Sequence, residues 1–206
     1  GASQKVVLFT STQPGEGKSF IAGNTAVSLA YMGKKVVIVG LDIRKPGLNK
    51  VFNLSHRTEG ITNYLADPEH TNLFDMIQHS DVSPNLDILP GGPIPPNPTE
   101  LMARTVLEDA IEKLKERYDY IILDTAPIAI ASRVADMCVF VCRADVTPKL
   151  GYQYINVLRD QKKFDKLATV INSIDLSSRK AGYGYGYGHK YGYGYGHKYG
   201  YGYGME

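Results

Sequence analysis

Three things are scarce in this sequence: cysteine, long apolar runs and an excess of charge. Its 206 residues include only two cysteines, Cys138 and Cys142. No apolar run approaches the ~18 residues that a transmembrane helix needs. The formal net charge is +2, which is too balanced to indicate a nucleic-acid surface, so we expect no nucleic-acid partner.

Both cysteines fall in the apolar run 137–142. On a strand, Cys138 and Cys142 would share one face and would be too far apart for a disulfide. We therefore expect buried free thiols, as in a reducing cytoplasm. A metal or redox role is the less favoured alternative.

Runs rich in Val, Ile and Leu alternate with helical patterns through most of the chain. The predicted strands are 5–10, 35–41, 86–89, 120–123, 137–142 and 168–171, and the predicted helices are 18–32, 98–117 and 150–162, with short helical pieces at 61–65 and 73–78. This alternation predicts the α/β class, with a mostly parallel sheet flanked by helices on both faces. We expect one domain at residues 1–180 and a separate segment at 181–206.

A glycine-rich stretch, residues 11–19, lies between the first predicted strand and the first predicted helix, and we call it the phosphate loop. Gly15 and Gly17 let the backbone turn its N–H groups inward, where they and the helix N-terminus can bind phosphate. Lys18 would reach the β- and γ-phosphates, and the Ser19 hydroxyl would bind Mg²⁺. Thr12 stands where such loops usually begin with glycine. The alternative is a glycine-rich turn with an incidental lysine. The expected nucleotide-contacting residues here are Pro14, Gly15, Glu16, Gly17, Lys18, Ser19 and Phe20.

Two aspartates directly follow apolar strands downstream of this loop. Asp42 comes after the strand at 35–41, and Asp124 comes after the strand at 120–123. Because parallel strands end at one edge of a sheet, both carboxylates can meet a phosphate-bound Mg²⁺ there. We expect Lys18, Asp42 and Asp124 to be catalytic, and Ser19 with the two aspartates to form the metal site. For either aspartate alone, capping of the next turn is the alternative.

The segment 181–206 alternates tyrosine with glycine. Glycine at every second position leaves no continuous apolar face to bury, so we expect a flexible tail with accessible phenols. An adhesive or linker tail of low complexity is the alternative. Together with a phosphate loop, accessible phenols indicate a phosphoryl acceptor. The nine tyrosines are Tyr183, Tyr185, Tyr187, Tyr191, Tyr193, Tyr195, Tyr199, Tyr201 and Tyr203.

The phosphate loop, the run Asp-Ile-Arg-Lys-Pro at 42–46, the run Ile-Leu-Asp-Thr-Ala-Pro at 122–127 and the tyrosine cluster together resemble the bacterial tyrosine kinases of polysaccharide synthesis and export. The resemblance implies ATP and Mg²⁺ as cofactors and autophosphorylation of the tail between molecules. It also implies that Asn172 contacts the base of the nucleotide, and the alternative role for Asn172 is that of a strand-end turn residue. The loop and aspartates alone would equally suit the deviant-Walker switch ATPases of partitioning and division-site placement.

The resemblance also implies partners and a location. The expected partners are other copies of the chain, a membrane-embedded co-polymerase segment or activator, and a cognate tyrosine phosphatase. We expect a cytoplasmic domain held at the inner face of the membrane through a segment absent from this chain.

Three features depart from the family pattern. Gly40 replaces an aspartate that usually precedes Asp42, which leaves Asp42 as the expected proton acceptor. The family's oligomerisation helix would precede residue 1, so the resemblance implies a ring oligomer for a longer protein that carries this helix and leaves ring assembly open for this chain. Residues 127–133 are also short for a crossover helix, which with its loops takes ~10–12 residues.

Overall fold

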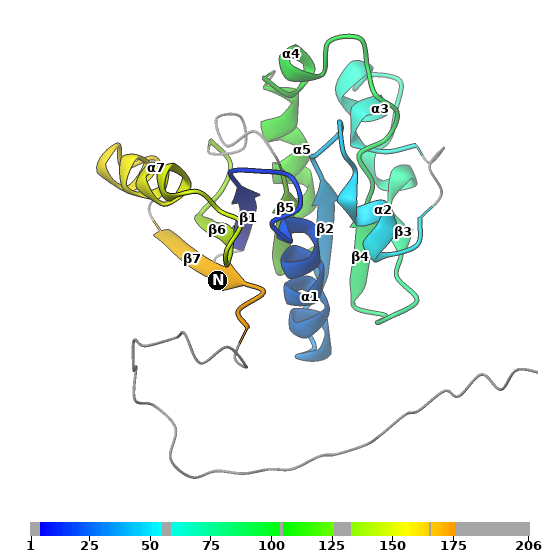
Figure 1. Cartoon of the computed structure of the whole chain (residues 1–206). Coiled ribbons are helices and arrows are strands. Elements are labelled where there is room, and N and C mark those ends of the chain that lie inside the picture. The colour runs from blue at the N-terminus through cyan, green and yellow to red at the C-terminus, as the bar shows by residue number, and fades with distance from the viewer. Residues whose placement is uncertain (1–4, 55–58, 104, 126–132, 165, 176–206) are drawn as a thin grey trace, which may run out of the picture. The chain divides into compact units, whose positions relative to one another are not determined.

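The computed structural model describes residues 5–54, 59–103, 105–125, 133–164 and 166–175, and its central element is a seven-stranded sheet in the order β3-β4-β2-β5-β1-β6-β7 (Figure 1). The parallel strands are β1 (Lys5–Ser11), β2 (Val36–Gly40), β4 (Leu86–Leu89), β5 (Tyr120–Asp124), β6 (Met137–Arg143) and β7 (Lys166–Asn172). The short edge strand β3 (Gln78–His79) is antiparallel to β4.

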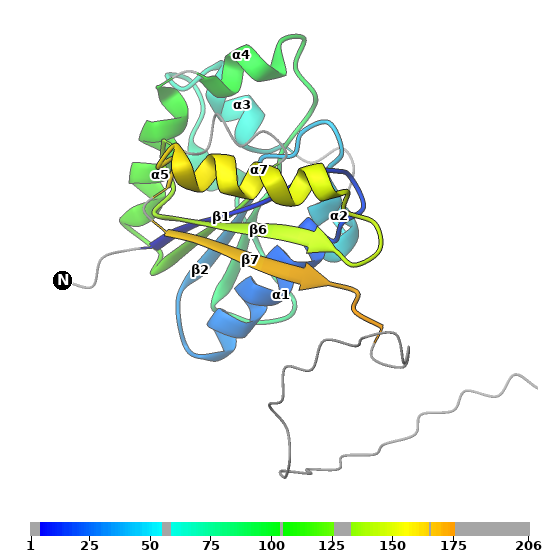
Figure 2. The same ribbon diagram turned by 60° about the vertical axis from the view of Figure 1, so that its left-hand side comes forward.

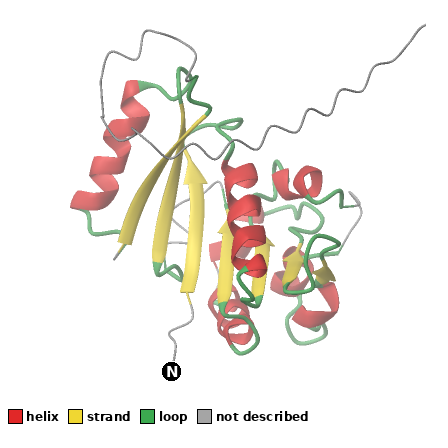
Figure 3. Cartoon of the chain, turned by 90° about the horizontal axis from the view of Figure 1, so that it is seen from below, coloured by secondary structure: helices red, strands yellow, loops and turns green. Residues whose placement is uncertain are grey.

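Helices cover both faces of this sheet (Figures 2 and 3). One face carries α1 (Lys18–Tyr31) and α2 (Gly47–Val51). The other face carries α3 (Ile61–Ala66), the 3-10 helix η1 (Leu73–Met76), α4 (Pro98–Ala103) and α5 (Val106–Lys115), with α7 (Lys149–Asp160) over β6. The predicted α/β class with a mostly parallel, doubly covered sheet is therefore confirmed.

The position of α1 follows from its small residues. Ala22, Ala26 and Ala30 are spaced by four, are fully or almost fully buried, and lie against the sheet face that includes Phe9 and Ile38. Small side chains let a helix approach the sheet closely without cavities. Gly33 follows the end of the helix in the left-handed conformation: its φ is 77°, and its N–H donates to the Ala30 carbonyl oxygen.

The structure also corrects the sequence-based element list. The predicted helix 98–117 is two helices, α4 and α5, and neither α2 nor β3 was predicted from the sequence. Both missed elements are short, with five and two residues, so their side-chain pattern is too brief to show a period. Strand β1 lies between β5 and β6, so their connection crosses over β1, but most of the short stretch 127–133 is outside the described residues.

The chain divides into two units, Gly1–Ile174 and Asp175–Glu206, and every helix and strand named above belongs to the first. The nine tail tyrosines lie outside the described residues. Among the residues that are described, no helix is both long and apolar enough to span a membrane.

Cys138 and Cys142 share one face of β6, are free and are fully buried, as predicted. Burial raises the pKa of the Cys138 thiol to about 12. Burial, followed by the nearby Glu16 carboxylate, also raises the pKa of the Cys142 thiol. Both thiols therefore stay protonated and unreactive at neutral pH.

We predict that iodoacetamide alkylates neither cysteine of the native protein at about pH 8, although an ordinary thiol with a pKa of about 8.5 reacts there. Mass spectrometry of the labelled chain measures the result, and the same labelling in denaturant, where both thiols should react, is the control. Rapid labelling of the native protein would contradict the burial of these side chains.

Candidate nucleotide site

The phosphate loop connects β1 to α1 at the carboxyl ends of the parallel strands (Figure 1). Gly15 and Gly17 have φ angles of 88° and 93°, a left-handed region that strongly favours glycine. A Cβ atom at Gly17 would lie 2.1 Å from the Asn172 amide nitrogen. Both glycines are thus required by the backbone, and this supports the prediction of a phosphate-binding turn.

The Lys18 side chain forms ion pairs with both predicted aspartates. Its Nζ atom bonds Oδ1 of Asp124 and lies 3.3 Å from Oδ2 of Asp42. The backbone fixes this approach, because the N–H groups of Leu41 and Asp42 donate to the Asp124 carbonyl oxygen over 2.8 and 3.0 Å. The ends of β2 and β5 and the start of α1 therefore meet at one ammonium group.

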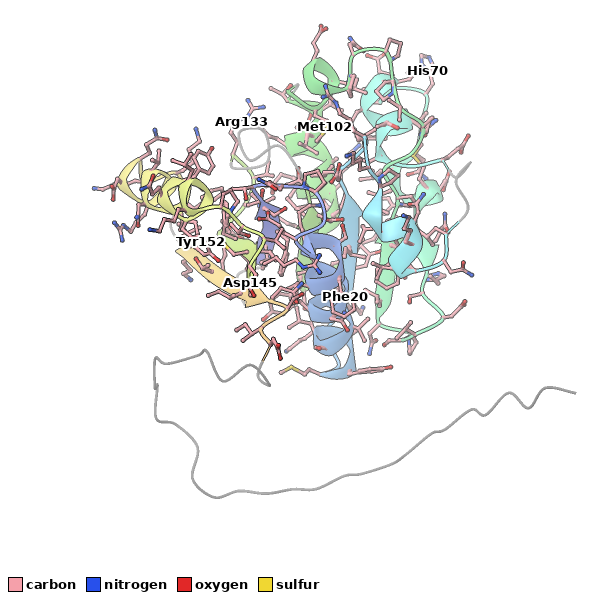
Figure 4. All side chains as sticks on the ribbon, in the orientation of Figure 1. Phe20, His70, Met102, Arg133, Asp145 and Tyr152 are labelled. Atoms are coloured by element: carbon pink, nitrogen blue, oxygen red, sulfur yellow. The ribbon has the colours of Figure 1, made fainter. Side chains whose placement is uncertain are left out.

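Ser19 and Phe20 occupy the first turn of α1 but face different surroundings. Gly47, the first residue of α2, lies against Ser19, since a Cβ atom there would be 2.2 Å from the Ser19 hydroxyl oxygen. Phe20 is 57% exposed, and Pro14 is also exposed. Figure 4 labels Phe20 beside α1. These two residues therefore border the loop on its solvent side.

Glu16 has a side chain with no exposed surface. Its carboxylate accepts hydrogen bonds from Thr12, Thr147 and the Gln13 N–H group. The Glu16 side chain thus turns into the protein, so only its backbone can face a nucleotide.

Asn172 ends β7 beside the loop. Its amide nitrogen donates to the Glu16 carbonyl oxygen over 3.1 Å, and its Oδ1 atom accepts from the Ser173 N–H group over 2.8 Å. Both polar atoms of the side chain are therefore engaged, and Asn172 can contact a base only by exchanging one of these bonds.

The residues present fit a hydrated Mg²⁺ beside phosphate. Asp124 Oδ2 is buried without a hydrogen-bond partner, and so are the hydroxyl oxygens of Thr10 and Thr125 at the ends of β1 and β5. A buried polar atom without a hydrogen-bond partner destabilises the fold unless a ligand or ion pairs with it. The described part of the chain has no group of three His, Cys, Asp or Glu that could hold a metal alone.

Four residues at this edge were missed in the sequence: Thr10, Thr125, Arg143 and Thr147. The threonines beside the strand ends carried the only available signal, namely their position next to Asp124 and the phosphate loop. Arg143 donates from Nη1 to the Gly15 carbonyl oxygen over 3.0 Å, although 128 residues separate the two. Contacts this distant in the sequence arise from the order of the strands.

Comparison with known proteins shows the family to which the chain belongs. A family model described as an AAA domain matches residues 4–141, more than half of the chain. The tyrosine-protein kinase CpsD of Streptococcus agalactiae is 31% identical over 198 residues, which are 92% of this chain and 84% of that protein. The tyrosine-protein kinase YwqD of Bacillus subtilis is 36% identical over 192 residues, which are 90% of this chain and 78% of that protein.

Solved structures agree with these relatives. The chimerical protein CapA2B2 has a TM-score of 0.73 and 32% identity, with 83% of this chain and 76% of that chain covered. The kinase domain of the Escherichia coli tyrosine kinase ETK has a TM-score of 0.76 and 25% identity, with 91% and 73% covered. A ParA family ATPase from Chlorobium tepidum, at 22% identity and a TM-score of 0.69, shares the fold alone. Since the family model and the curated relatives each cover most of this sequence, the chain belongs to the bacterial tyrosine-protein kinase family.

Proposed function

We propose that this kinase transfers the γ-phosphoryl group of ATP to the tyrosines of its own tail, residues 181–206, and that the reaction occurs between copies. The observation that carries the proposal is the Lys18 ammonium group, which is held by Asp42 and Asp124 where the phosphate loop enters α1. The same chain carries nine tyrosines in a glycine-rich segment, and these supply an acceptor.

In this proposal the phosphate loop binds the nucleotide through its backbone. The N–H groups of the loop and of the α1 N-terminus bind phosphate oxygens. Lys18 leaves its two carboxylates and neutralises charge on the β- and γ-phosphates. The nucleotide-contacting set is Pro14, Gly15, Glu16, Gly17, Lys18, Ser19, Phe20 and Asn172.

Once Lys18 has moved to phosphate, Asp42 and Asp124 can orient the water molecules of a bound Mg²⁺, and the Ser19 hydroxyl can bind the ion directly. Bound Mg²⁺ supplies positive charge at the transferring phosphoryl group. The position of Ser19 against Gly47 supports this role, because the contact fixes the hydroxyl at the start of α1.

Asp42 is the proposed acceptor of the tyrosine proton. Its side chain is 16% exposed, whereas that of Asp124 is 1% exposed, so Asp42 is the carboxylate that a phenol from solvent can approach. A phenol has a pKa of about 10, so the carboxylate helps as the proton leaves rather than by prior deprotonation.

Reaction between copies is the mode that the family resemblance implies. A random coil as long as the glycine-rich residues 181–206 would have a root-mean-square span of ~28 Å, which permits reaction within one copy or between two. Within one copy, each of the nine acceptors would need a different loop to reach the same site. A neighbouring copy can meet all nine in any order.

We further propose that this reaction regulates the synthesis and export of capsular or extracellular polysaccharide. In that setting the chain works with a membrane-embedded co-polymerase segment or activator and is reset by a tyrosine phosphatase. The switch ATPase is the rival function, and it differs in sending the phosphoryl group to water.

Removing Lys18 should destabilise the nucleotide-free protein, because it leaves the buried Asp124 carboxylate without its cation. We predict that Lys18→Met lowers the free energy of unfolding by about 3 kcal/mol, the usual effect of breaking a buried ion pair. Lys18→Met combined with Asp124→Asn should lose less than the sum of the two single variants. Urea unfolding without nucleotide measures all three, and Lys34→Met, at an exposed lysine after α1, is the control. Strictly additive losses would show that the pair is not energetically coupled.

Mixing two variants tests the proposed reaction. A Lys18→Met chain with its tail is incubated with an active chain that ends before residue 182, in the presence of Mg²⁺ and ATP labelled in the γ-phosphate. We predict label on the tail of the Lys18→Met chain, because the neighbour supplies the site. That chain alone should stay unlabelled. If it also stays unlabelled in the mixture while the intact protein labels itself, reaction between copies is excluded.

A further inference from the structure

The phosphate loop is held from the inside by a buried carboxylate. Glu16 Oε1 lies 2.9 Å from the Thr12 hydroxyl oxygen and also accepts from the Thr147 hydroxyl. Oε2 lies 2.8 Å from the Gln13 nitrogen and 3.1 Å from the Thr12 hydroxyl oxygen. Three donors therefore hold a side chain that has no exposed surface. Two of them are in the loop itself, and the third is not.

That third donor comes from the connection between β6 and α7. The Thr147 hydroxyl donates to Glu16 while it accepts from the Arg143 N–H group over 2.7 Å. The Arg143 guanidinium also donates to the Gly15 carbonyl oxygen. The last residue of β6 and the connection after it thus touch the loop at two successive residues, Gly15 and Glu16. The two elements that this connection joins lie beside the loop in Figure 2.

The first turn of α7 packs against Thr147 and Thr12, the two hydroxyl donors of Glu16. Gly151 is buried, and a Cβ atom there would lie 2.9 Å from Cγ2 of Thr147 and 3.1 Å from Cγ2 and Oγ1 of Thr12. The first distance is shorter than real Cβ contacts tolerate. A side chain at this position would press on both hydroxyl donors of Glu16. The hydrogen bond from its hydroxyl to Glu16 gives Thr12 a structural role at the position where such loops usually have glycine.

We infer that Thr147 and Gly151 are positioning residues for the nucleotide, which act through Glu16 and Thr12 on the shape of the phosphate loop. This inference rests on the proposed binding of ATP by the loop. A loop that already has its bound shape loses less conformational freedom when the phosphates arrive, so its affinity is higher. Two residues outside the loop, one just before α7 and one in its first turn, thereby set the affinity for the nucleotide without touching it.

Variants of the whole 206-residue chain test this inference through the dissociation constant for ATP with Mg²⁺, measured by titration calorimetry. Thr147→Val keeps the shape of the side chain and removes the hydroxyl, whereas Thr147→Ser keeps the hydroxyl. Gly151→Ala adds the obstructing Cβ atom. Thr169→Val, at an exposed threonine of β7, is the matched control for loss of a hydroxyl. Thermal midpoints without nucleotide check that each variant is folded at the temperature of the titration.

We expect Thr147→Val to weaken ATP binding about tenfold, as loss of a hydrogen bond to a charged group predicts. Gly151→Ala should also weaken binding, while Thr147→Ser and Thr169→Val should bind ATP with nearly the affinity of the unaltered chain. Unchanged affinity in Thr147→Val, or failure of Thr147→Ser to restore it, would overturn the inference while leaving the proposed function intact. Absence of ATP binding by the unaltered chain would overturn both.

Discussion

The Lys18 ammonium group between two carboxylates is the interaction on which the nucleotide site depends. Lys18 begins α1, Asp42 follows β2 and Asp124 ends β5, so one cation joins three elements that are distant in the sequence. The pair with Asp124 is almost fully buried, where an unpartnered charge is strongly destabilising. In the proposed reaction this arrangement changes: Lys18 moves to the phosphates, and the two carboxylates face a hydrated Mg²⁺ in its place.

The sheet order supplies the geometry for that exchange. Strand β5 lies between β2 and β1 and is parallel to both, and the Asp124 carbonyl oxygen accepts from two N–H groups beyond the end of β2. Their carboxyl ends therefore deliver the loop and both aspartates to one edge. On the other side of β1, the end of β6 and the start of α7 support the loop through Arg143, Thr147 and Gly151. The loop thus has the charged cluster of Lys18 and the two aspartates on one side and the hydrogen-bonding residues Arg143 and Thr147 on the other.

The sequence predicted the parts of this site that carry local signals. Glycines in a turn, a lysine at a helix start and aspartates after apolar strands are all visible within a few residues, and the alternation of elements predicted the sheet. The support from Arg143 and Thr147 was not predictable, because each lies more than 125 positions from its partner in the loop. The inward orientation of Glu16 was not predictable for the same reason, since Thr147, its hydrogen-bond donor from outside the loop, lies in a distant part of the sequence. The two shortest elements, α2 and β3, had too few residues to show a pattern.

The destination of the phosphoryl group tests the account most directly. The intact chain is incubated with Mg²⁺ and ATP labelled in the γ-phosphate, after which tail peptides and released inorganic phosphate are counted separately. The account predicts label on tyrosines between Tyr183 and Tyr203, in excess of label released as phosphate. Labelled inorganic phosphate with unlabelled tyrosines would contradict it and identify the chain as an ATPase that uses the same site to bind and hydrolyse its nucleotide.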